Sequence, residues 1–433
     1  MGRRPRPPHL HSRAQGARVT SRPIGEDRDR LRRDYDPYAG VGISTQLAEL
    51  AARRAELPLS WSGRGNGCWV LTEYDDVSAL LRLNNRGVVS FPNEPDGTNA
   101  VGSRVAMIPI EIDGAEHRQY RRYLDPQFAP QKVAALADHL REQANRFIDG
   151  FIEDGRCDFV EGFALPFPGA TVLAIMGWPL EDLERMNRWT STLLHGVAGG
   201  TLEENAQARG QAHVEFSAYM MEKIPQWRAA PRQDDVTSVM LDAEINGAKM
   251  TDQELFDFFV LMMTAGLDTV QSVLARCAVY FAAHPEQWDA MFADPSGLDA
   301  AVEELLRWAT PPVPTRTVTD ETVTFQGVAI PRGDRIHAPL AAANRDPKYY
   351  PDPDSVIFDR APKPHLAFGV GPHRCVGLHL ARLELRIAFE ELHRRIPRFQ
   401  LDTDAPAPRE HLGLAWGVDH VHLVFAPGPR EAS

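Results

Sequence analysis

A cysteine in a glycine-rich segment is the residue of this chain best suited to chemistry. Cys375 lies in FGVGPHRCVG (368–377), directly before a stretch with the spacing of an amphipathic helix. A thiolate at the start of a helix is stabilised by the helix dipole, by free N–H groups and by neighbouring basic residues. The glycines let the backbone approach a flat ligand closely. The segment therefore predicts a thiol of lowered pKa, although a cysteine considered alone is as often merely buried.

An acid and an alcohol stand side by side within a long apolar segment. Residues 255–283 carry apolar residues on most faces of the expected helix, which is typical of a helix in a core. Ala265 and Gly266 precede Asp268 and Thr269 in this segment. A hydroxyl group both donates and accepts hydrogen bonds, so the pair is suited to delivering protons to a buried centre. The alternative is that both polar residues lie on the helix surface and that the glycine serves close helix packing.

Other charged residues occur at helical spacing. Glu304 and Arg307 lie one turn apart, and His117 and Arg121 are related as i and i+4. Taken alone, each pair is compatible with a solvated surface, where ion pairs contribute little to stability. Their interpretation depends on the motifs around them.

Taken together, these motifs resemble those of the cytochromes P450. Phe-Gly-x-Gly-x-His-x-Cys-x-Gly is similar to the haem-binding signature of that family, and Ala-Gly-x-Asp-Thr to its oxygen-activation helix. The Glu-x-x-Arg pair falls between them, as in the family. The resemblance covers roughly residues 30–428 and is strongest to the soluble bacterial class, including the camphor-hydroxylating type. It implies a mainly α fold with small β-sheets, in which haem b lies between the long helix and the helix after the cysteine.

The resemblance also implies a role for each motif. Cys375 is the thiolate ligand of the haem iron, a ligand that donates electron density and favours O–O cleavage. Thr269 hydrogen-bonds the bound oxygen or its water and Asp268 relays protons, so these two are the catalytic residues. The residues expected to bind the haem are His117, Arg121, Ala265, Gly266, Arg316, Phe368, Gly369, His373, Cys375 and Gly377.

Within that set the resemblance distinguishes several tasks. The two haem propionates are expected to be held by His117, Arg121, Arg316 and His373. Gly266 is expected to leave room for oxygen over the iron. The Glu304–Arg307 pair is expected to form a structural lock with a third partner in 345–360, for which Arg360 is the candidate.

The implied activity is monooxygenation, the insertion of one oxygen atom from O2 into a small apolar substrate. Electrons would come from a separate ferredoxin and its reductase, because no reductase domain is fused. Alternatives are epoxidation, desaturation or aromatic coupling at the same haem, and a haem-binding sensor, against which the Asp268–Thr269 pair speaks. A cysteine hydrolase is disfavoured because His373 is poorly placed as its base. Candidate substrate contacts are Phe91, Met107, Leu261, Met262, Val313 and Trp416.

Composition limits the other functions. The net charge of −12 argues against nonspecific binding of nucleic acid. The four cysteines lack the spacing of a zinc site or a disulfide framework, which fits a reducing cytoplasm. We find no run of roughly 20 apolar residues that would predict a membrane span, and the basic N-terminus lacks the apolar core of a signal peptide.

Five arginines are expected to form a basic patch for an acidic redox partner: Arg121, Arg122, Arg374, Arg382 and Arg386.

The elements that must position these residues follow from local patterns. Residues 1–30 are expected to be a disordered tail, and 31–433 a single catalytic domain. Helical spacing predicts helices at 41–56, 74–83 and 376–396, and mostly helix between 114 and 290. Strands are predicted at 68–72, within 318–338 and at 420–425. Two irregular segments are expected, a long loop at 84–112 and a Pro- and Asp-rich stretch at 345–374.

Overall fold

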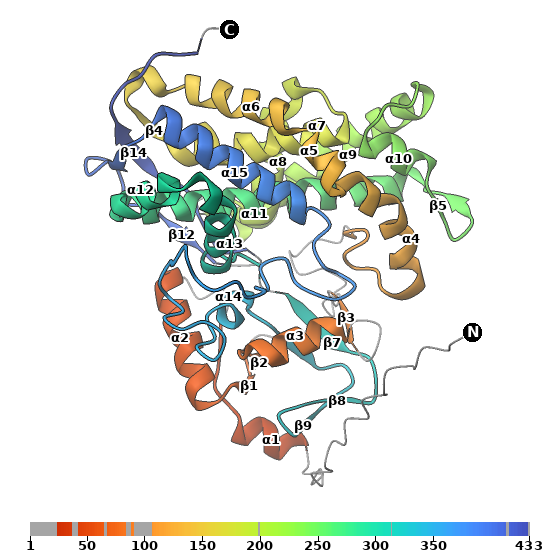
Figure 1. Ribbon diagram of the computed structural model, residues 1–433. Helices are drawn as coiled ribbons and strands as arrows, with labels where there is room; N and C mark the ends of the chain where they lie inside the picture. The colour runs from red at the N-terminus through yellow and green to blue at the C-terminus, as the bar shows by residue number, and fades with distance from the viewer. Residues whose placement is uncertain are drawn as a thin grey trace, which may run out of the picture.

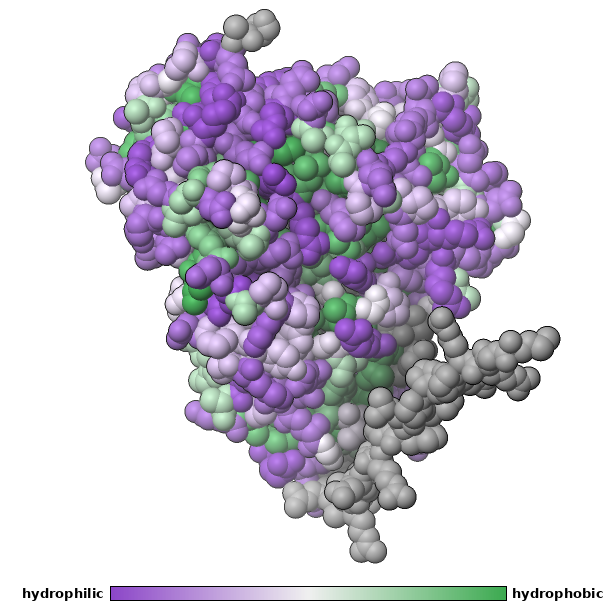
Figure 2. Space-filling view, viewed as in Figure 1, coloured by the Kyte–Doolittle hydropathy of each residue, from purple (hydrophilic) through white to green (hydrophobic). Residues whose placement is uncertain are grey.

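The computed structural model describes residues 24–36, 42–64, 67–83, 88–90, 106–197, 200–312, 314–412 and 415–431. Helices fill the upper part of the view in Figure 1, and the largest sheet lies below them with α2 and α3. The prediction of a mainly α protein with small sheets is confirmed. The face seen in Figure 2 is mostly hydrophilic, with small groups of hydrophobic residues between.

The helices account for most of the described residues. In chain order they are α1 (Ile24–Arg30), α2 (Ile43–Glu56), α3 (Tyr74–Arg82), α4 (Gly114–Leu124), α5 (Pro130–Ala134), α6 (Ala137–Asp149), α7 (Pro166–Met176), α8 (Leu183–His195), α9 (Leu202–Ala229), α10 (Val236–Asp242), α11 (Asp252–Ala283), α12 (Pro285–Ala293), α13 (Leu298–Trp308), α14 (Leu340–Ala343) and α15 (Leu378–Arg395).

The strands are short and form several small sheets. They are β1 (Leu59–Ser62), β2 (Cys68–Leu71), β3 (Val88–Ser90), β4 (Arg156–Asp158), β5 (Glu244–Ile245), β6 (Ala248–Lys249), β7 (Thr315–Val318), β8 (Thr322–Phe325), β9 (Val328–Pro331), β10 (Arg335–His337), β11 (Phe399–Leu401), β12 (Glu410–His411), β13 (Gly417–Val418) and β14 (His422–Phe425). The largest sheet has the order β1-β2-β10-β7-β3, and β10 is parallel to β2 and antiparallel to β7. A second sheet has the order β11-β14-β4.

Helix α11 is the central element of the helical part. It begins with a capping box, in which the Thr251 hydroxyl accepts from the N–H of Glu254 and the Glu254 carboxylate accepts from the N–H of Thr251. The helix therefore begins one residue after the capping threonine, and Asp252 is its first residue. Its length and composition are those of a membrane span, but 83% of its most apolar window is buried inside the protein.

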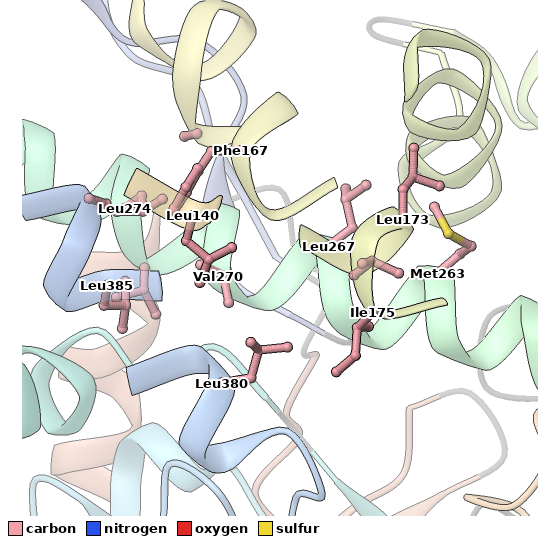
Figure 3. Close-up of a cluster of buried hydrophobic side chains, with 14 of the residues drawn as sticks. Leu140, Phe167, Leu173, Ile175, Met263, Leu267, Val270, Leu274, Leu380 and Leu385 are labelled. Atoms are coloured by element: carbon pink, nitrogen blue, oxygen red, sulfur yellow. The ribbon is translucent and has the colours of Figure 1, made fainter. Parts of the chain in front are cut away.

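The main hydrophobic core surrounds this helix. Figure 3 shows side chains from α6, α7, α11 and α15 meeting in one cluster, with Leu140, Phe167, Leu173, Ile175, Met263, Leu267, Val270, Leu274, Leu380 and Leu385 labelled. Because α15 follows the cysteine segment directly, this packing fixes the position of that segment relative to α11. A smaller core cluster lies under the largest sheet and includes Trp69, Ile336 and Leu366.

Most predicted elements are present, with two corrections. Within the expected loop at 84–112, Val88–Ser90 form β3 and pair with β7. The expected tail at 1–30 is wrong for its last residues, because 24–30 form α1 and pack against the sheets. Arg28 of this helix forms an ion pair of 2.5 Å with Asp334. Residues 1–23 lie outside the described part of the chain. The stretch at 345–374 is irregular as expected, with only turns and bends.

Candidate functional site

The cysteine segment forms a tight loop whose backbone bonds to itself. The N–H of Cys375 donates to the carbonyl oxygen of Phe368 at 2.9 Å. Gly369 and Gly371 have φ angles of +62° and +81°, which favour glycine. A Cβ on Gly371 would lie 2.5 Å from the carbonyl oxygen of Leu81, so the loop also needs glycine for its close approach to α3. The loop thereby presents Cys375 just before α15.

The thiol of Cys375 differs from its predicted state. Burial by surrounding protein raises its pKa, while the N–H of Gly377 and the charges of Arg121 and Arg382 act in the opposite direction. The pKa is therefore raised and not lowered as expected, because the loop's N–H groups and charges do not outweigh desolvation. Part of the Cys375 side chain is nevertheless exposed and accessible to a ligand. A coordinated cation would deprotonate such a thiol.

The expected propionate-binding residues come together beside this loop. His373 Nε2 lies 2.7 Å from Asp113 Oδ1, and the His373 and His117 rings have centroids 4.1 Å apart. Arg121 donates from Nη1 to the carbonyl oxygen of Arg374 at 2.8 Å. Arg316 is buried on β7. Burial lowers its pKa to about 10, and the charge of Asp113 only partly opposes this shift.

This cluster has the chemistry of an anion-binding site. Burial lowers the pKa of His117 to about 4, and its Nδ1 is buried without a hydrogen-bond partner among the described residues. A carboxylate brought beside the ring would supply that partner and favour its charged form. His117, His373 and Arg316 lie around Asp113, and Arg121 is paired with Asp125 beside them. Such a set of donors fits a group with two carboxylates, such as haem.

The catalytic candidates lie in the middle of α11. Asp268 is buried, and its Oδ1 lies 2.6 Å from Nε2 of His195, the last residue of α8. Burial lowers the pKa of His195, but the charge of Asp268 and its hydrogen bond outweigh this, so the pKa is raised. Thr269 donates from Oγ1 to the carbonyl oxygen of Ala265 at 3.1 Å. Ala265 itself is exposed, and its neighbours Thr264 and Gly266 are partly buried.

Gly266 lies where α11 packs against α7. A Cβ at this position would lie 2.5 Å from Cγ2 of Val172, on α7. The missing side chain therefore allows α7 and α11 to pack closely, which was the structural alternative. The expectation that Gly266 makes room for oxygen stays a prediction.

The Glu-x-x-Arg pair forms the predicted lock, and Arg360 is its third member. Glu304 lies 2.7 Å from Arg307 and 3.1 Å from Arg360, measured from carboxylate oxygen to guanidinium nitrogen. Arg307 also donates to the carbonyl oxygen of Asn344 at 3.0 Å. The side chain of Asn344 in turn accepts from the N–H of Leu366 at 2.7 Å, just before the cysteine loop. The lock is thus connected to the loop through one asparagine.

The substrate candidates are less well gathered. Met107 is buried before α4, and Leu261 and Met262 are each 9% exposed on α11. Trp416 belongs to a separate cluster with Tyr35 and others, away from the main core. The remaining two candidates, at positions 91 and 313, lie outside the described residues.

Several residues of the site were not predicted. His195 and Asp113 pair with Asp268 and His373, from which they are separated by 73 and 260 residues. Glu384 on α15 is buried, and burial raises its pKa to about 8. None of the three carries a motif of its own, although an acid on the apolar face of a predicted helix was a usable indication for Glu384.

Comparisons with known proteins agree with this site. The family model described as Cytochrome P450 matches residues 296–416. A probable cytochrome P450 127A1 of Sinorhizobium fredii is 33% identical over 84% of both chains. A steroid C26-monooxygenase of Mycolicibacterium smegmatis is 32% identical over 73% of this chain and 79% of its own.

The fold comparison gives the same result. The structure of a mutant of P450 EryK in complex with erythromycin B has a TM-score of 0.79 and 29% identity, and the match covers 90% of this chain and 98% of that one. The relatives named as P450 are oxidoreductases, and their cofactor is haem b. The chain described here belongs to the cytochrome P450 family.

Proposed function

We propose that this cytochrome P450 inserts one oxygen atom from O2 into a small apolar substrate, with Cys375 as the iron ligand. The observation that carries the proposal is the pair of Asp268 and Thr269, because Asp268 is buried and bonded to His195. A protein that only binds haem needs no such acid in the core. When bound, the haem supplies the redox chemistry that activates oxygen.

The residues of this chain would then have separate tasks. His117, Arg121, Arg316 and His373 would hold the two propionates, since they lie together beside the cysteine loop. Asp268 and His195 share a proton across 2.6 Å and would pass it toward the Thr269 hydroxyl. Thr269 would accept this hydrogen bond at Oγ1 and donate its own hydroxyl proton into the site, giving up its present bond to Ala265.

An apolar substrate is supported by the residues that face the open side of α11. Ala265 is exposed on α11, and Leu261 and Met262 one turn earlier are apolar. The Mycolicibacterium relative is named for a steroid, an apolar molecule. The identity of the substrate is best approached by screening apolar compounds for a low-spin to high-spin change in the haem spectrum.

We further propose an acidic ferredoxin as electron donor, bound near α4 and the cysteine loop. The basic patch is smaller than expected, because Arg382 pairs with Glu303 and Arg386 with Asp299 and Glu390. Arg122 and Arg374 remain exposed at the surface, and no ion pair to either is found within the described residues. These two arginines are therefore the proposed centre of the docking surface.

We also assign the protein to the cytoplasm, a proposal supported by its four free cysteines.

The test of the proposal is the spectrum of the reduced protein with carbon monoxide. Thiolate ligation gives a Soret band clearly separated from that of histidine-ligated haem proteins. Cys375→Ala should abolish the thiolate band and the monooxygenase activity, while Cys68→Ala, a change of the same kind on β2, should keep both. A Soret band of the histidine-ligated type in the unaltered protein would refute the assignment of Cys375.

A further inference from the structure

Two histidines and an aspartate from three separate segments meet beside the catalytic pair. They are His195 at the end of α8, Asp268 on α11 and His411 on β12, and each offers one ligand atom within 4.8 Å of the other two. The rings of His195 and His411 have centroids 4.4 Å apart. Because the three come from different parts of the chain, the fold and not local spacing creates the cluster.

His411 is oriented as a ligand toward this cluster. Its Nδ1 lies 2.8 Å from Oδ1 of Asp419, and Asp419 is also paired with Arg409. The carboxylate keeps the proton on Nδ1, so the lone pair of the ring is on Nε2. That Nε2 is buried and has no hydrogen-bond partner in the described part of the chain. A carboxylate behind a ring of this orientation is the usual support of a metal-binding histidine.

Gly417 on the paired strand β13 leaves space for the ring of His411. A Cβ on Gly417, the partner of His411 in the β12–β13 pairing, would lie 2.8 Å from His411 Nε2. Any larger residue at 417 would push the ring out of its place. The orientation of His411 therefore depends on both Asp419 and Gly417.

We propose that His195, Asp268 and His411 form a reversible Zn²⁺ site. Two imidazole nitrogens and one carboxylate oxygen, with a fourth position open to water, are a donor set that Zn²⁺ accepts. With bonds of about 2.0–2.2 Å, ligand atoms around tetrahedral zinc lie about 3.4 Å apart. Atoms within 4.8 Å of one another reach this arrangement by small side-chain rotations. The metal takes the place of the proton between His195 and Asp268.

The surrounding charges suit a divalent cation. With neutral histidines, Asp268 and Asp419 balance the two charges of Zn²⁺, and Arg409 lies behind Asp419. The remaining charged group that acts on His195 is Arg209 of α9. Zn²⁺ must displace the proton that His195 shares with Asp268, so binding releases a proton to solvent and weakens as the pH falls. Mg²⁺ and Ca²⁺, which take oxygen ligands, should not compete.

Zn²⁺ bound at this site would affect catalysis, a consequence that rests on the proposed function. If Asp268 carries protons to Thr269, a metal on its carboxylate blocks that transfer. Zn²⁺ would then inhibit oxygen consumption without displacing the substrate. The site itself does not depend on this role, so binding and inhibition are measured separately.

Binding is tested by calorimetry on the haem-loaded protein, prepared without a polyhistidine tag and titrated with ZnCl2 or MgCl2. We expect one high-affinity Zn²⁺ per chain, no response to Mg²⁺, and release of protons in weakly buffered solution. His411→Gln, which can keep a hydrogen bond to Asp419, and Asp268→Asn should each weaken binding at least tenfold. His420→Gln is the matched control, because His420 is bonded to Asp158 outside the cluster.

The outcomes separate the two proposals. Unchanged Zn²⁺ affinity in both His411→Gln and Asp268→Asn, with haem spectra like the unaltered protein, would overturn the site. In the second arm, Zn²⁺ should lower oxygen consumption, a chelator should restore it, and His411→Gln should need at least tenfold more metal for the same fractional inhibition. Zn²⁺ bound at the site with oxygen consumption unaffected would leave the site established and refute the proton-carrying role of Asp268.

Discussion

Thr269 and Asp268 are adjacent in sequence but are held in different ways. Among the described residues, the hydroxyl of Thr269 bonds only to the helix carbonyl of Ala265, whereas Asp268 is bonded to His195 on another helix. We predict that Thr269→Ala uncouples the enzyme, so that more electrons leave as peroxide and fewer as oxygenated product. Asp268→Asn should slow oxygen consumption itself by about 100-fold, a typical contribution of a positioned proton donor. Both are measured as oxygen, peroxide and product per electron supplied.

Thr264 provides the control for this experiment. It lies on the same helix, and its hydroxyl also donates to helix carbonyls, those of Val260 and Leu261. Thr264→Ala should remain coupled. Full coupling in Thr269→Ala would mean that this alcohol is not part of the proton path, as when a substrate hydroxyl takes its place.

Glu384 is a buried acid whose effect on stability has an unusual sign. Burial raises its pKa from 4.5 to about 8, opposed by a hydrogen bond with Thr171. The folded protein therefore holds the proton of Glu384 more tightly than the unfolded chain does. The stabilisation of the folded state by this proton is fully present below pH 4.5. It is lost as the pH rises toward 8, at up to about 1.4 kcal/mol per pH unit. Glu384→Gln should remove this loss, measured as the difference in melting temperature between pH 6 and pH 8.5.

Glu391 on the same helix is the matched comparison. Burial raises its pKa, but hydrogen bonds from Arg394 and Asn145 outweigh this, and the pKa is lowered. Its contribution is present at neutral pH and is lost as the pH falls through the folded-state pKa. Glu391→Gln should therefore destabilise the protein at pH 7. A steeper pH dependence in Glu384→Gln than in the unaltered protein would contradict the assignment.

At the residue scale, the sequence predicted motif residues better than their partners. The lock of Glu304, Arg307 and Arg360 was expected from the Glu-x-x-Arg pattern and from the segment 345–360, because its first two members are close in sequence. His195 could not be expected, since it meets Asp268 only when α8 packs on α11. The low thiol pKa was wrongly expected for Cys375 because local N–H groups and charges are visible in sequence but desolvation is not.

Between elements, the lock holds α13 against the irregular segment that leads to the cysteine loop. Arg360 donates from Nε to Glu304 at 3.1 Å, and its side chain is 11% exposed. Arg360→Ala leaves Glu304 with a weaker set of partners and should lower the free energy of unfolding by about 2 kcal/mol, as expected for a hydrogen bond to a charged group. Urea unfolding at pH 7 measures this loss, and haem transfer to apomyoglobin should become faster as the loop loosens.

Arg398 serves as the control for the lock. It forms an ion pair with Asp289 at the surface, and its side chain is 60% exposed. Arg398→Ala should cost no more than about 1 kcal/mol, because water screens such pairs. Equal losses in the two variants would show that Arg360 is not part of a buried lock.

Helix and strand positions were predictable where the periodicity is long or the caps are clear. The helices expected at 41–56 and 376–396 are observed as α2 and α15 within two residues at each end. The helix at 24–30 was missed because it is short and acquires its stability from packing, including the Arg28–Asp334 pair. Sheet order could not be predicted, since β2 pairs in parallel with β10 from a distant part of the chain.

For the whole molecule, the distribution of charge determines how an acidic partner would approach. The net charge is −12, so the exposed Arg122 and Arg374 form a local exception near the cysteine loop. Reduction by an acidic ferredoxin should slow as ionic strength rises, because the Debye length is about 10 Å at 0.1 M salt. Arg122→Glu and Arg374→Glu should each slow reduction at low salt, by roughly tenfold together. Stopped-flow measurement of haem reduction gives both rates.

Arg430→Glu is the control for this surface. Arg430 follows β14 in the chain and pairs with Glu153. In Figure 1, β14 lies on the opposite side of the view from α4. Reversal of its charge should leave the reduction rate unchanged. A rate that is flat with salt, together with no effect of the two reversals near the loop, would place electron entry elsewhere.

We propose that the residues from Ile24 onward form one folding unit. The largest sheet joins β1 and β2 from the N-terminal region to β7 and β10 from the C-terminal half. Removing the strands of either region would expose the hydrogen-bonding edge of the strands from the other region. A truncation that begins at residue 68, after β1, should accordingly lose cooperative unfolding, whereas two independent domains would tolerate the cut.

The pairing of β4 with β14 determines when the second sheet can form during synthesis of the protein. Asp158 of β4 faces His422 of β14, which is 264 residues later in the chain. At about 5–20 residues per second, a ribosome needs roughly 13–53 s to produce the second strand after the first. During that interval β4 lacks β14, its partner strand in the sheet. The second sheet therefore closes only after Cys375 has been made, and the nascent helical core must remain soluble until then.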